Sequence, residues 1–189
     1  MNEVEPAWRS EQKAIDAVLD NLAATCRMVF ITGLPASGKS FLLQKLMIAA
    51  GEKGRRVHLL RWDTGLSAFE TPETLKLFPQ VDSGSHPVIR KAAGIWGRRA
   101  IRKWEVEHTD PGDILIGEVP IIGNRFSEFV QVLEDETESL LSSDMTQFVY
   151  PIPSNALRDR LEARRRETFA SPGHPDEAKD APPSTMDYA

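Results

Sequence analysis

Residues 28–50 read MVFITGLPASGKSFLLQKLMIAA, and this stretch decides the fold. Its first part, residues 28–32, is a short apolar run of the kind found in buried strands. A glycine-rich turn that contains a lysine follows it. After the turn, the side chains that recur at intervals typical of a helix are Phe41, Leu42, Lys45, Leu46 and Ala49. The stretch therefore predicts a strand, a tight turn and a helix in direct succession.

The turn itself, GLPASGKS at residues 33–40, fits the pattern G-x-x-x-x-G-K-[ST] at every fixed position. Loops of this spacing surround phosphates, because their backbone N–H groups point inward and the following helix presents its positive end. Lys39 is expected to reach the β- and γ-phosphates, and the Ser40 hydroxyl to bind Mg²⁺. The pattern thus predicts ATP and Mg²⁺ as ligands. The residues expected to surround the phosphates are Gly33, Leu34, Pro35, Ala36, Ser37, Gly38, Lys39, Ser40 and Phe41.

Length and composition describe an ordinary globular protein. The 189 residues are 41% hydrophobic and 27% charged, which is enough for one domain with a substantial core. A net charge of −5 gives no reason to expect general affinity for nucleic acids or membranes. The single cysteine, Cys26, rules out an internal disulfide framework and suits a reducing compartment. With an acidic start and no apolar run of about 18 residues, the chain is predicted to be cytoplasmic.

Periodicity places further elements on both sides of the loop. Residues 6–24 predict an amphipathic helix, and the side chains expected on its buried face are Ile15, Val18, Leu19 and Leu22. Three more strands are predicted at 56–62, 113–117 and 146–152. Further helices are predicted at 71–78, 86–108, 124–142 and 155–169. Ser154 or Asn155 is expected to cap the last of these, with Leu157 and Leu161 facing inward.

The domain organisation follows from these elements. Residues 1–170 are assigned to one domain, in which 1–27 hold the N-terminal helix and 153–170 a basic, lid-like helix. The stretch 171–189 is rich in Pro, Asp, Glu, Ala and Ser, and is predicted to be disordered. The alternation of strands and helices predicts an α/β fold with a mainly parallel sheet of at least four strands. Ligands of such sheets bind at the carboxyl ends of the strands, where Gly33, Asp63 and Glu118 all fall.

The loop wording and these strand-end carboxylates resemble the P-loop small-molecule and nucleotide kinases, such as gluconate-type, zeta-toxin-type and polynucleotide-type kinases. The resemblance covers residues 28–169 in architecture, but is specific in wording only at the loop. It implies a three-layer P-loop NTPase fold and ATP-dependent phosphoryl transfer to a small-molecule or nucleotide acceptor. In that group, a carboxylate placed like Asp63 orients or deprotonates the acceptor hydroxyl, and one placed like Glu118 assists Mg²⁺.

Lid arginines that clamp phosphates during transfer are also implied by the resemblance. The candidates in the last helix are Arg158, Arg160, Arg164, Arg165 and Arg166. Arg158 and Arg165 are favoured, because residues seven apart share one face of a helix. Each assignment has a plainer alternative: Asp63 caps a turn, Glu118 is a solvated strand end, and the arginines form an exposed charged face.

The predicted helix at 86–108 carries six cations, which contrast with the acidic whole. They are Arg90, Lys91, Arg98, Arg99, Arg102 and Lys103. Such a helix suits an anionic acceptor, including a nucleic-acid end, although the overall charge does not favour nucleic acid as a partner. The alternative is a solvated helix face whose tryptophans pack inward.

Other P-loop classes lack their signatures here, because neither an N-K-x-D nor an L-S-G-G-Q segment is present. A Rossmann G-x-G-x-x-G pattern is also missing. One feature departs from the kinase pattern, which usually has a fifth strand beside the adenine. The segment WRSEQKAIDAVL instead resembles the stretch of helicase-like and AAA-like ATPases in which a glutamine, here Gln12, reads the adenine. A second hypothesis is therefore a non-transferring ATPase, switch or DNA-linked ATPase module.

Overall fold

A computed structural model describes residues 7–33, 37–81, 84–119 and 132–171 of the chain. Within them, four strands form one sheet, namely β1 (Met28–Ile31), β2 (Arg56–Arg61), β3 (Asp113–Glu118) and β4 (Thr146–Val149). The spatial order is β2-β3-β1-β4, and every neighbouring pair is parallel. The predicted α/β class with a parallel sheet of four strands is confirmed.

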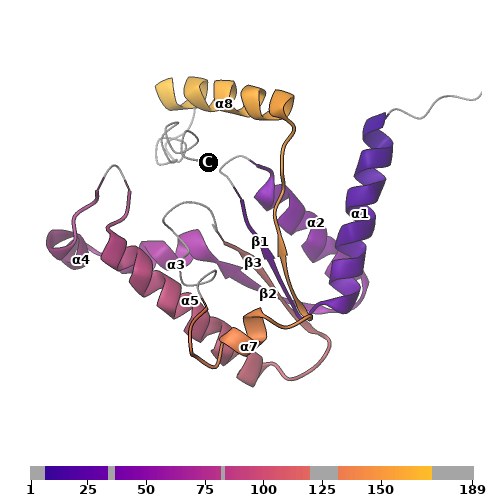
Figure 1. The fold of residues 1–189 in the computed structure, drawn as a ribbon, viewed down its shortest axis with the longest axis horizontal. Helices are drawn as coiled ribbons and strands as arrows, with labels where there is room; N and C mark the ends of the chain where they lie inside the picture. The colour runs from indigo at the N-terminus through magenta and orange to yellow at the C-terminus, as the bar shows by residue number, and fades with distance from the viewer. Residues whose placement is uncertain (1–6, 34–36, 82–83, 120–131, 172–189) are drawn as a thin grey trace, which may run out of the picture.

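Seven helices surround this sheet in the described residues (Figure 1). They are α1 (Ala7–Thr25), α2 (Lys39–Glu52), α3 (Trp62–Phe69), α4 (Pro72–Leu77), α5 (Pro87–Glu107), α7 (Glu138–Leu141) and α8 (Asn155–Ala170). None of these described helices is both long enough and apolar enough to cross a bilayer.

Two hydrophobic cores lie on the two faces of the sheet, because successive side chains of a strand point to opposite faces. On one face, Val29 and Ile31 pack with buried side chains of α1 and α2. On the other, Met28 and Phe30 pack with side chains of α3, α5 and α7. All four residues of β1 are buried, as expected for a central strand covered on both faces.

The register of the sheet brings three strand ends to one level. Ile31, the last residue of β1, lies between Glu118 of β3 and Val149 of β4. The backbone N–H of Val119 donates to the Ile31 carbonyl at 3.0 Å, and that of Thr32 donates to the Val149 carbonyl at 2.8 Å. The glycine turn that follows β1 therefore emerges between the ends of β3 and β4.

The buried faces of the first two helices differ from the prediction. Ile15 and Val18 are 45% and 56% exposed, whereas Leu19 and Ala23 are buried. Helix α1 packs mainly on α2, so its buried face is the one that carries Leu19 and Ala23, and an ion pair of 2.7 Å joins Lys45 of α2 to Asp16 of α1. On α2, Phe41 is exposed, and the buried side chains are Leu43, Leu46, Ala49 and Ala50.

Several predicted boundaries are also wrong. Strand β4 ends at Val149, three residues before the predicted end. Of the helix predicted at 124–142, residues 124–131 lie outside the described part, 132–137 are not helical, and α7 has four residues. The Asp135 carboxylate explains the late start, because it accepts hydrogen bonds from the N–H groups of Thr137 and Glu138. In α8, Leu157 is 48% exposed rather than inward-facing.

A cluster of arginines fixes the opposite, amino edge of the sheet. The side chain of Asp113, the first residue of β3, accepts hydrogen bonds from Arg56 at 2.8 and 3.1 Å and shares one with His58 at 3.0 Å. Arg27 and Arg55 donate to the backbone carbonyl of the same residue at 2.8 and 2.9 Å. The bonds from Arg56 first, and from His58 second, hold the pKa of Asp113 well below its usual range.

This arrangement predicts an acid-sensitive contribution to stability. A carboxyl whose pKa is lower in the folded state stabilises the fold above its unfolded pKa of about 4, and this contribution is lost as the pH falls further. The Asp113→Asn variant should therefore be less stable than wild type at pH 7, and the difference should shrink towards pH 3. Urea unfolding of both proteins at the two pH values measures it. A difference that grows on acidification would contradict the assignment.

Candidate functional site

The two glycines of the turn that the structure describes, Gly33 and Gly38, both have a positive φ. Gly33 has a φ of 139°, and Gly38, which precedes α2, has a φ of 88°. Both values disfavour any residue with a Cβ. No side chain caps α2, whose N-terminal N–H groups lack helical partners. The Ser37 Oγ is buried and has no hydrogen-bond partner among the described residues. Leu34, Pro35 and Ala36 lie outside the described residues.

The structure brings Ser40 and Glu118 together, although they are 78 residues apart in the chain. The Ser40 hydroxyl donates a hydrogen bond to Glu118 Oε1 at 3.4 Å. Their contact follows from the topology, because β3, which ends in Glu118, is a direct neighbour of the strand that leads into the turn. Two hard oxygen donors at this spacing suit Mg²⁺, which takes few protein ligands and completes its shell with water and phosphate oxygens.

The described residues contain no group of three His, Cys, Asp or Glu side chains placed to hold a metal ion. A cation at Ser40 and Glu118 would therefore take the rest of its ligands from water or from a bound phosphate chain. Lys39 is the first residue of α2, next to Ser40. Phe41, also predicted to line the loop, is 57% exposed. The centroid of its ring lies 5.4 Å from the Lys45 Nζ.

Asp63 lies in a helix rather than in the predicted loop. Strand β2 ends at Arg61, one residue before the predicted end, and α3 begins at Trp62. Trp62, which is 3% exposed, packs in the core with Met28 and Phe30 of β1. Asp63 thus occupies the first turn of α3, two residues beyond the position that pairs with Glu118. Its side chain lies outside the described part of the structure.

Helix α3 is held closely against α5. A Cβ on Gly65 would lie 2.6 Å from the ring of Trp96, so only glycine permits this approach. The ring centroids of Phe69 and Trp96 are 6.3 Å apart with an interplanar angle of 68°, an edge-to-face contact between the two helices. This packing fixes the helix on which Asp63 stands.

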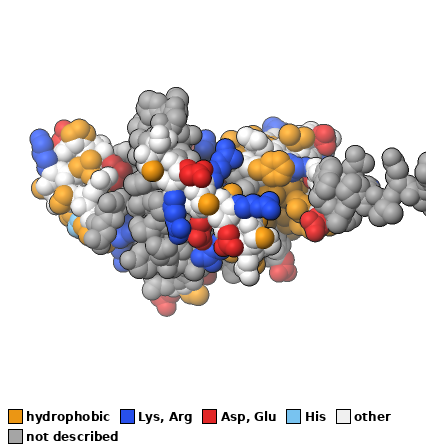
Figure 2. Space-filling view, turned by 90° about the horizontal axis from the view of Figure 1, so that it is seen from above, with side chains coloured by type: hydrophobic (Ala, Val, Ile, Leu, Met, Phe, Trp, Pro, Cys, Tyr) orange, Lys and Arg blue, Asp and Glu red, His pale blue; other side chains and the backbone are white. Residues whose placement is uncertain are grey.

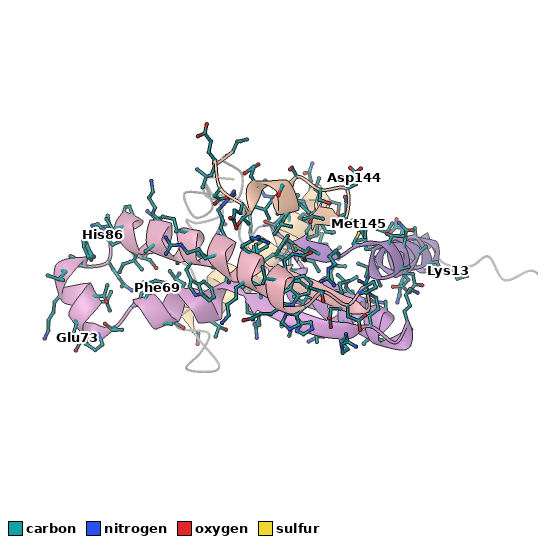
Figure 3. The ribbon with its side chains drawn as sticks, turned by 90° about the horizontal axis from the view of Figure 1, so that it is seen from below. Lys13, Phe69, Glu73, His86, Asp144 and Met145 are labelled. Carbon is teal, nitrogen blue, oxygen red and sulfur yellow. The ribbon has the colours of Figure 1, made fainter. Side chains whose placement is uncertain are left out.

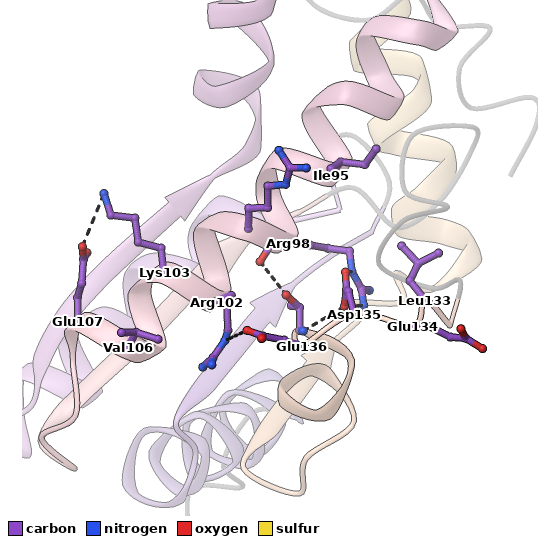
Figure 4. Close-up of a pocket in the computed structure, with 12 residues that line it drawn as sticks. Ile95, Arg98, Arg102, Lys103, Val106, Glu107, Leu133, Glu134, Asp135 and Glu136 are labelled. Atoms are coloured by element: carbon purple, nitrogen blue, oxygen red, sulfur yellow. Dashed lines mark hydrogen bonds and ion pairs between the residues drawn. The ribbon is translucent and has the colours of Figure 1, made fainter.

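Half of the cations predicted to attract an anionic acceptor are bound to carboxylates of the chain itself. They line a cleft of about 760 Å³ between α5 and residues 133–137 (Figure 4). Arg98 donates to Asp135 at 2.8 and 2.6 Å and to Glu138 at 2.9 Å. Arg102 pairs with Glu136 at 2.7 Å, and Lys103 pairs with Glu107 at 3.7 Å.

The three remaining cations are Arg90, Lys91 and Arg99. They form no ion pair with any described residue. The bonds from Arg98 lower the pKa of Asp135 and Glu138, so both carboxylates are charged at neutral pH. In Figure 1 the end of α5 that meets α7 lies towards the amino ends of the strands, away from the glycine turn. In this half of α5 the cations are thus already paired within the chain, and binding of an anionic acceptor by the helix stays a prediction.

Helix α8 lies beyond the carboxyl ends of β1 and β4 (Figure 1). The Ser154 side chain caps it by accepting from the Leu157 N–H at 3.4 Å, as predicted. Arg158 donates to Glu162 at 2.8 Å on the same helix, which raises the pKa of Arg158. The side chain of Arg165 is outside the described residues. Seen from this end, the Lys and Arg side chains of the described residues are interspersed with Asp and Glu (Figure 2).

Gln12, which was predicted to read the adenine, is an exposed residue in the second turn of α1.

Tyr150, which was not among the predicted site residues, lies against the first glycine of the turn. The ring of Tyr150, the first residue after β4, lies 3.2 Å from the position that a Cβ on Gly33 would take. Only the strand order places β4 beside β1, so no local pattern indicated this contact.

Comparison of the chain with protein-family models, with curated proteins and with solved structures gave no match.

Proposed function

We propose that this protein is a P-loop phosphotransferase, which moves the γ-phosphoryl group of ATP to a small hydroxyl- or phosphate-bearing acceptor. The observation that carries the proposal is the 3.4 Å contact between Ser40 and Glu118 beside a turn of the pattern G-x-x-x-x-G-K-[ST]. The pattern alone predicts a phosphate cradle. The contact adds a carboxylate from a second strand at the point where the pattern requires a cation.

In this proposal, the backbone of the turn and Lys39 neutralise the phosphate chain, and Ser40 and Glu118 hold the cation. Bound Mg²⁺ would neutralise charge on the β- and γ-phosphate oxygens. The acceptor oxygen attacks the γ-phosphorus, the bond to the bridging oxygen breaks, and ADP leaves. Such a reaction needs alignment and charge neutralisation more than covalent help from the protein. Asp63 is assigned to hold the acceptor hydroxyl in line and to take its proton.

The proposal is tested by acceptor-dependent formation of ADP. The protein is incubated with ATP, Mg²⁺ and pools of sugars, nucleosides and nucleoside monophosphates, and ADP is measured against a sample without acceptor. At least one pool is expected to raise the rate at least tenfold. Nucleotide binding with no stimulation by any pool would count against transfer.

With an acceptor in hand, the Asp63→Asn variant separates binding from transfer. The affinity for ATP should stay within about twofold of wild type, because no phosphate contact is lost, whereas kcat should fall about a hundredfold or more. Isothermal titration and the transfer assay measure the two quantities. Asp144→Asn is the matched control, since Asp144 is an exposed carboxylate just ahead of β4 at the other edge of the sheet (Figure 3). Wild-type transfer by Asp63→Asn would remove the base assignment.

A second candidate function is an ATPase or ATP-dependent switch that transfers nothing to a small molecule. It is favoured by the pairing of Arg98, Arg102 and Lys103 with carboxylates, which leaves fewer cations for an anionic acceptor. A ligand that binds only the folded state raises the melting temperature. Melting with ATP and Mg²⁺, and then with added metabolite pools or DNA, separates the candidates. Extra protection by DNA alone would favour the ATPase.

A further inference from the structure

The ring of Tyr150 lies at the mouth of the glycine turn. Its Cε2 atom is 3.2 Å, and the Cδ atom of Pro151 3.4 Å, from the position of a Cβ on Gly33. Because Gly33 has no Cβ, the ring rests directly on the backbone of the first glycine of the pattern. A ligand bound against the backbone of Gly33 would therefore lie near this ring.

The ring has a free surface at this position. Tyr150 is 37% exposed. Within the described part of the chain, no other aromatic ring stacks on it, and its hydroxyl forms no hydrogen bond. The preceding aromatic residue of the same strand, Phe148, is engaged differently, since it stacks on Phe30 with ring centroids 5.3 Å apart. The two side chains are about equally exposed, Phe148 at 38% and Tyr150 at 37%, but among the described residues only Phe148 has another ring stacked on it.

The groups on the two sides of β1 indicate how a bound nucleotide would be oriented. The Ser40–Glu118 contact lies on the β3 side of β1, and Tyr150 lies on the β4 side. If the terminal phosphates and their cation lie at Ser40 and Glu118, the other end of the nucleotide leaves the turn towards β4. Tyr150 is the aromatic residue that directly follows that strand.

We propose that Tyr150 is the residue on which the nucleobase stacks. This inference rests on the proposed function, and it supplies the base contact that a sheet with β4 at its edge does not otherwise provide. Stacking on an aromatic side chain does not depend strongly on the identity of the base, because every base has a π-face. The site should accordingly bind ATP and GTP with affinities within a few-fold of each other. Recognition by the Gln12 amide would instead make the site selective for adenine.

The experiment compares a ligand that has a base with one that has only phosphates. Wild type, Tyr150→Phe, Tyr150→Leu and Tyr150→Ala are titrated in a calorimeter with ATP and with inorganic tripolyphosphate, each with Mg²⁺. The Ala and Leu variants should lose about tenfold in affinity for ATP, as expected when a stacking ring is removed. Their affinity for tripolyphosphate should stay within twofold of wild type, and Tyr150→Phe should resemble wild type with both ligands.

Other outcomes overturn the assignment. An equal loss for both ligands would mean that Tyr150 only shapes the turn, and no loss for ATP would mean that the base lies elsewhere. A loss specific to ATP in Gln12→Ala, but not in Tyr150→Ala, would transfer the role to α1. If wild type binds tripolyphosphate as tightly as ATP, the base has no site and the Tyr150 proposal alone fails. If wild type binds neither ligand, the proposed function fails with it.

Discussion

Replacement of Lys39 by alanine should lower the affinity for ATP and Mg²⁺ about a hundredfold or more, while the fold is retained. Lys39 is the first residue of α2, directly after the left-handed Gly38, and its side chain is only partly buried. Truncation therefore leaves no large cavity, but it removes the only side-chain cation that the sequence pattern assigns to the phosphate chain. Isothermal titration with ATP and Mg²⁺ measures the loss, and thermal unfolding checks that the fold is intact.

The same helix offers a matched control. Lys53 follows the C-terminal end of α2 and forms an ion pair of 3.3 Å with Asp20, both side chains being largely exposed. Exposed pairs of this kind contribute at most about 1 kcal/mol to stability. The Lys53→Ala variant should therefore bind ATP as wild type does. An equal loss of affinity in the two variants would show that charge in general, rather than Lys39, attracts the nucleotide.

Among the substitutions proposed here, Arg98→Ala should lower the free energy of unfolding the most, by about 3 kcal/mol. The Arg98 side chain is 2% exposed, and its guanidinium forms three hydrogen bonds with Asp135 and Glu138. Its backbone carbonyl also accepts a hydrogen bond from the Thr137 hydroxyl at 3.1 Å. Truncation leaves a cavity and removes the cation that faces both carboxylates. For a chain of this length, the melting temperature should fall by about 6–12 °C.

Arg102, one helical turn further along α5, is the control for this prediction. It forms a single pair with Glu136, whose side chain is 77% exposed, so Arg102→Ala should cost less than about 1 kcal/mol. Arg98→Lys should not restore wild-type stability, because an ammonium lacks the planar fork that binds two carboxylates. Urea unfolding of the three variants gives the comparison. If Arg98→Ala and Arg102→Ala lowered the free energy of unfolding by similar amounts, burial of the Arg98 guanidinium would contribute nothing to stability.

The elements of the sheet were predictable because their signals are local. An apolar run, a glycine turn and a helical repeat identify β1, the turn and α2 within 23 residues of sequence. The topology rule for parallel sheets also placed Gly33 and Glu118 at the same edge. The resemblance to P-loop kinases, rather than the strand order, then assigned Ser40 and Glu118 to one Mg²⁺ site.

Contacts that depend on the strand order or on the exact rotation of a helix were not predictable. Tyr150 reaches Gly33 only because β4 pairs with β1, and that pairing has no short-range pattern. Periodicity placed Leu19 correctly on the buried face of α1 but also placed Val18 there, since it defines a face only to within about one residue. Arginine is a residue type normally found at the surface. The ion pairs with Asp135 and Glu138 are what make the burial of Arg98 possible.

The most direct test of the central claim is a calorimetric titration of the wild-type chain with ATP in the presence and absence of Mg²⁺, repeated with Glu118→Gln. If the turn, Ser40 and Glu118 form one triphosphate site, wild type binds ATP in the micromolar range. In that case Mg²⁺ strengthens the binding at least tenfold, and Glu118→Gln loses most of that gain. Absence of binding at millimolar ATP, or binding that neither Mg²⁺ nor Glu118→Gln changes, would contradict the claim.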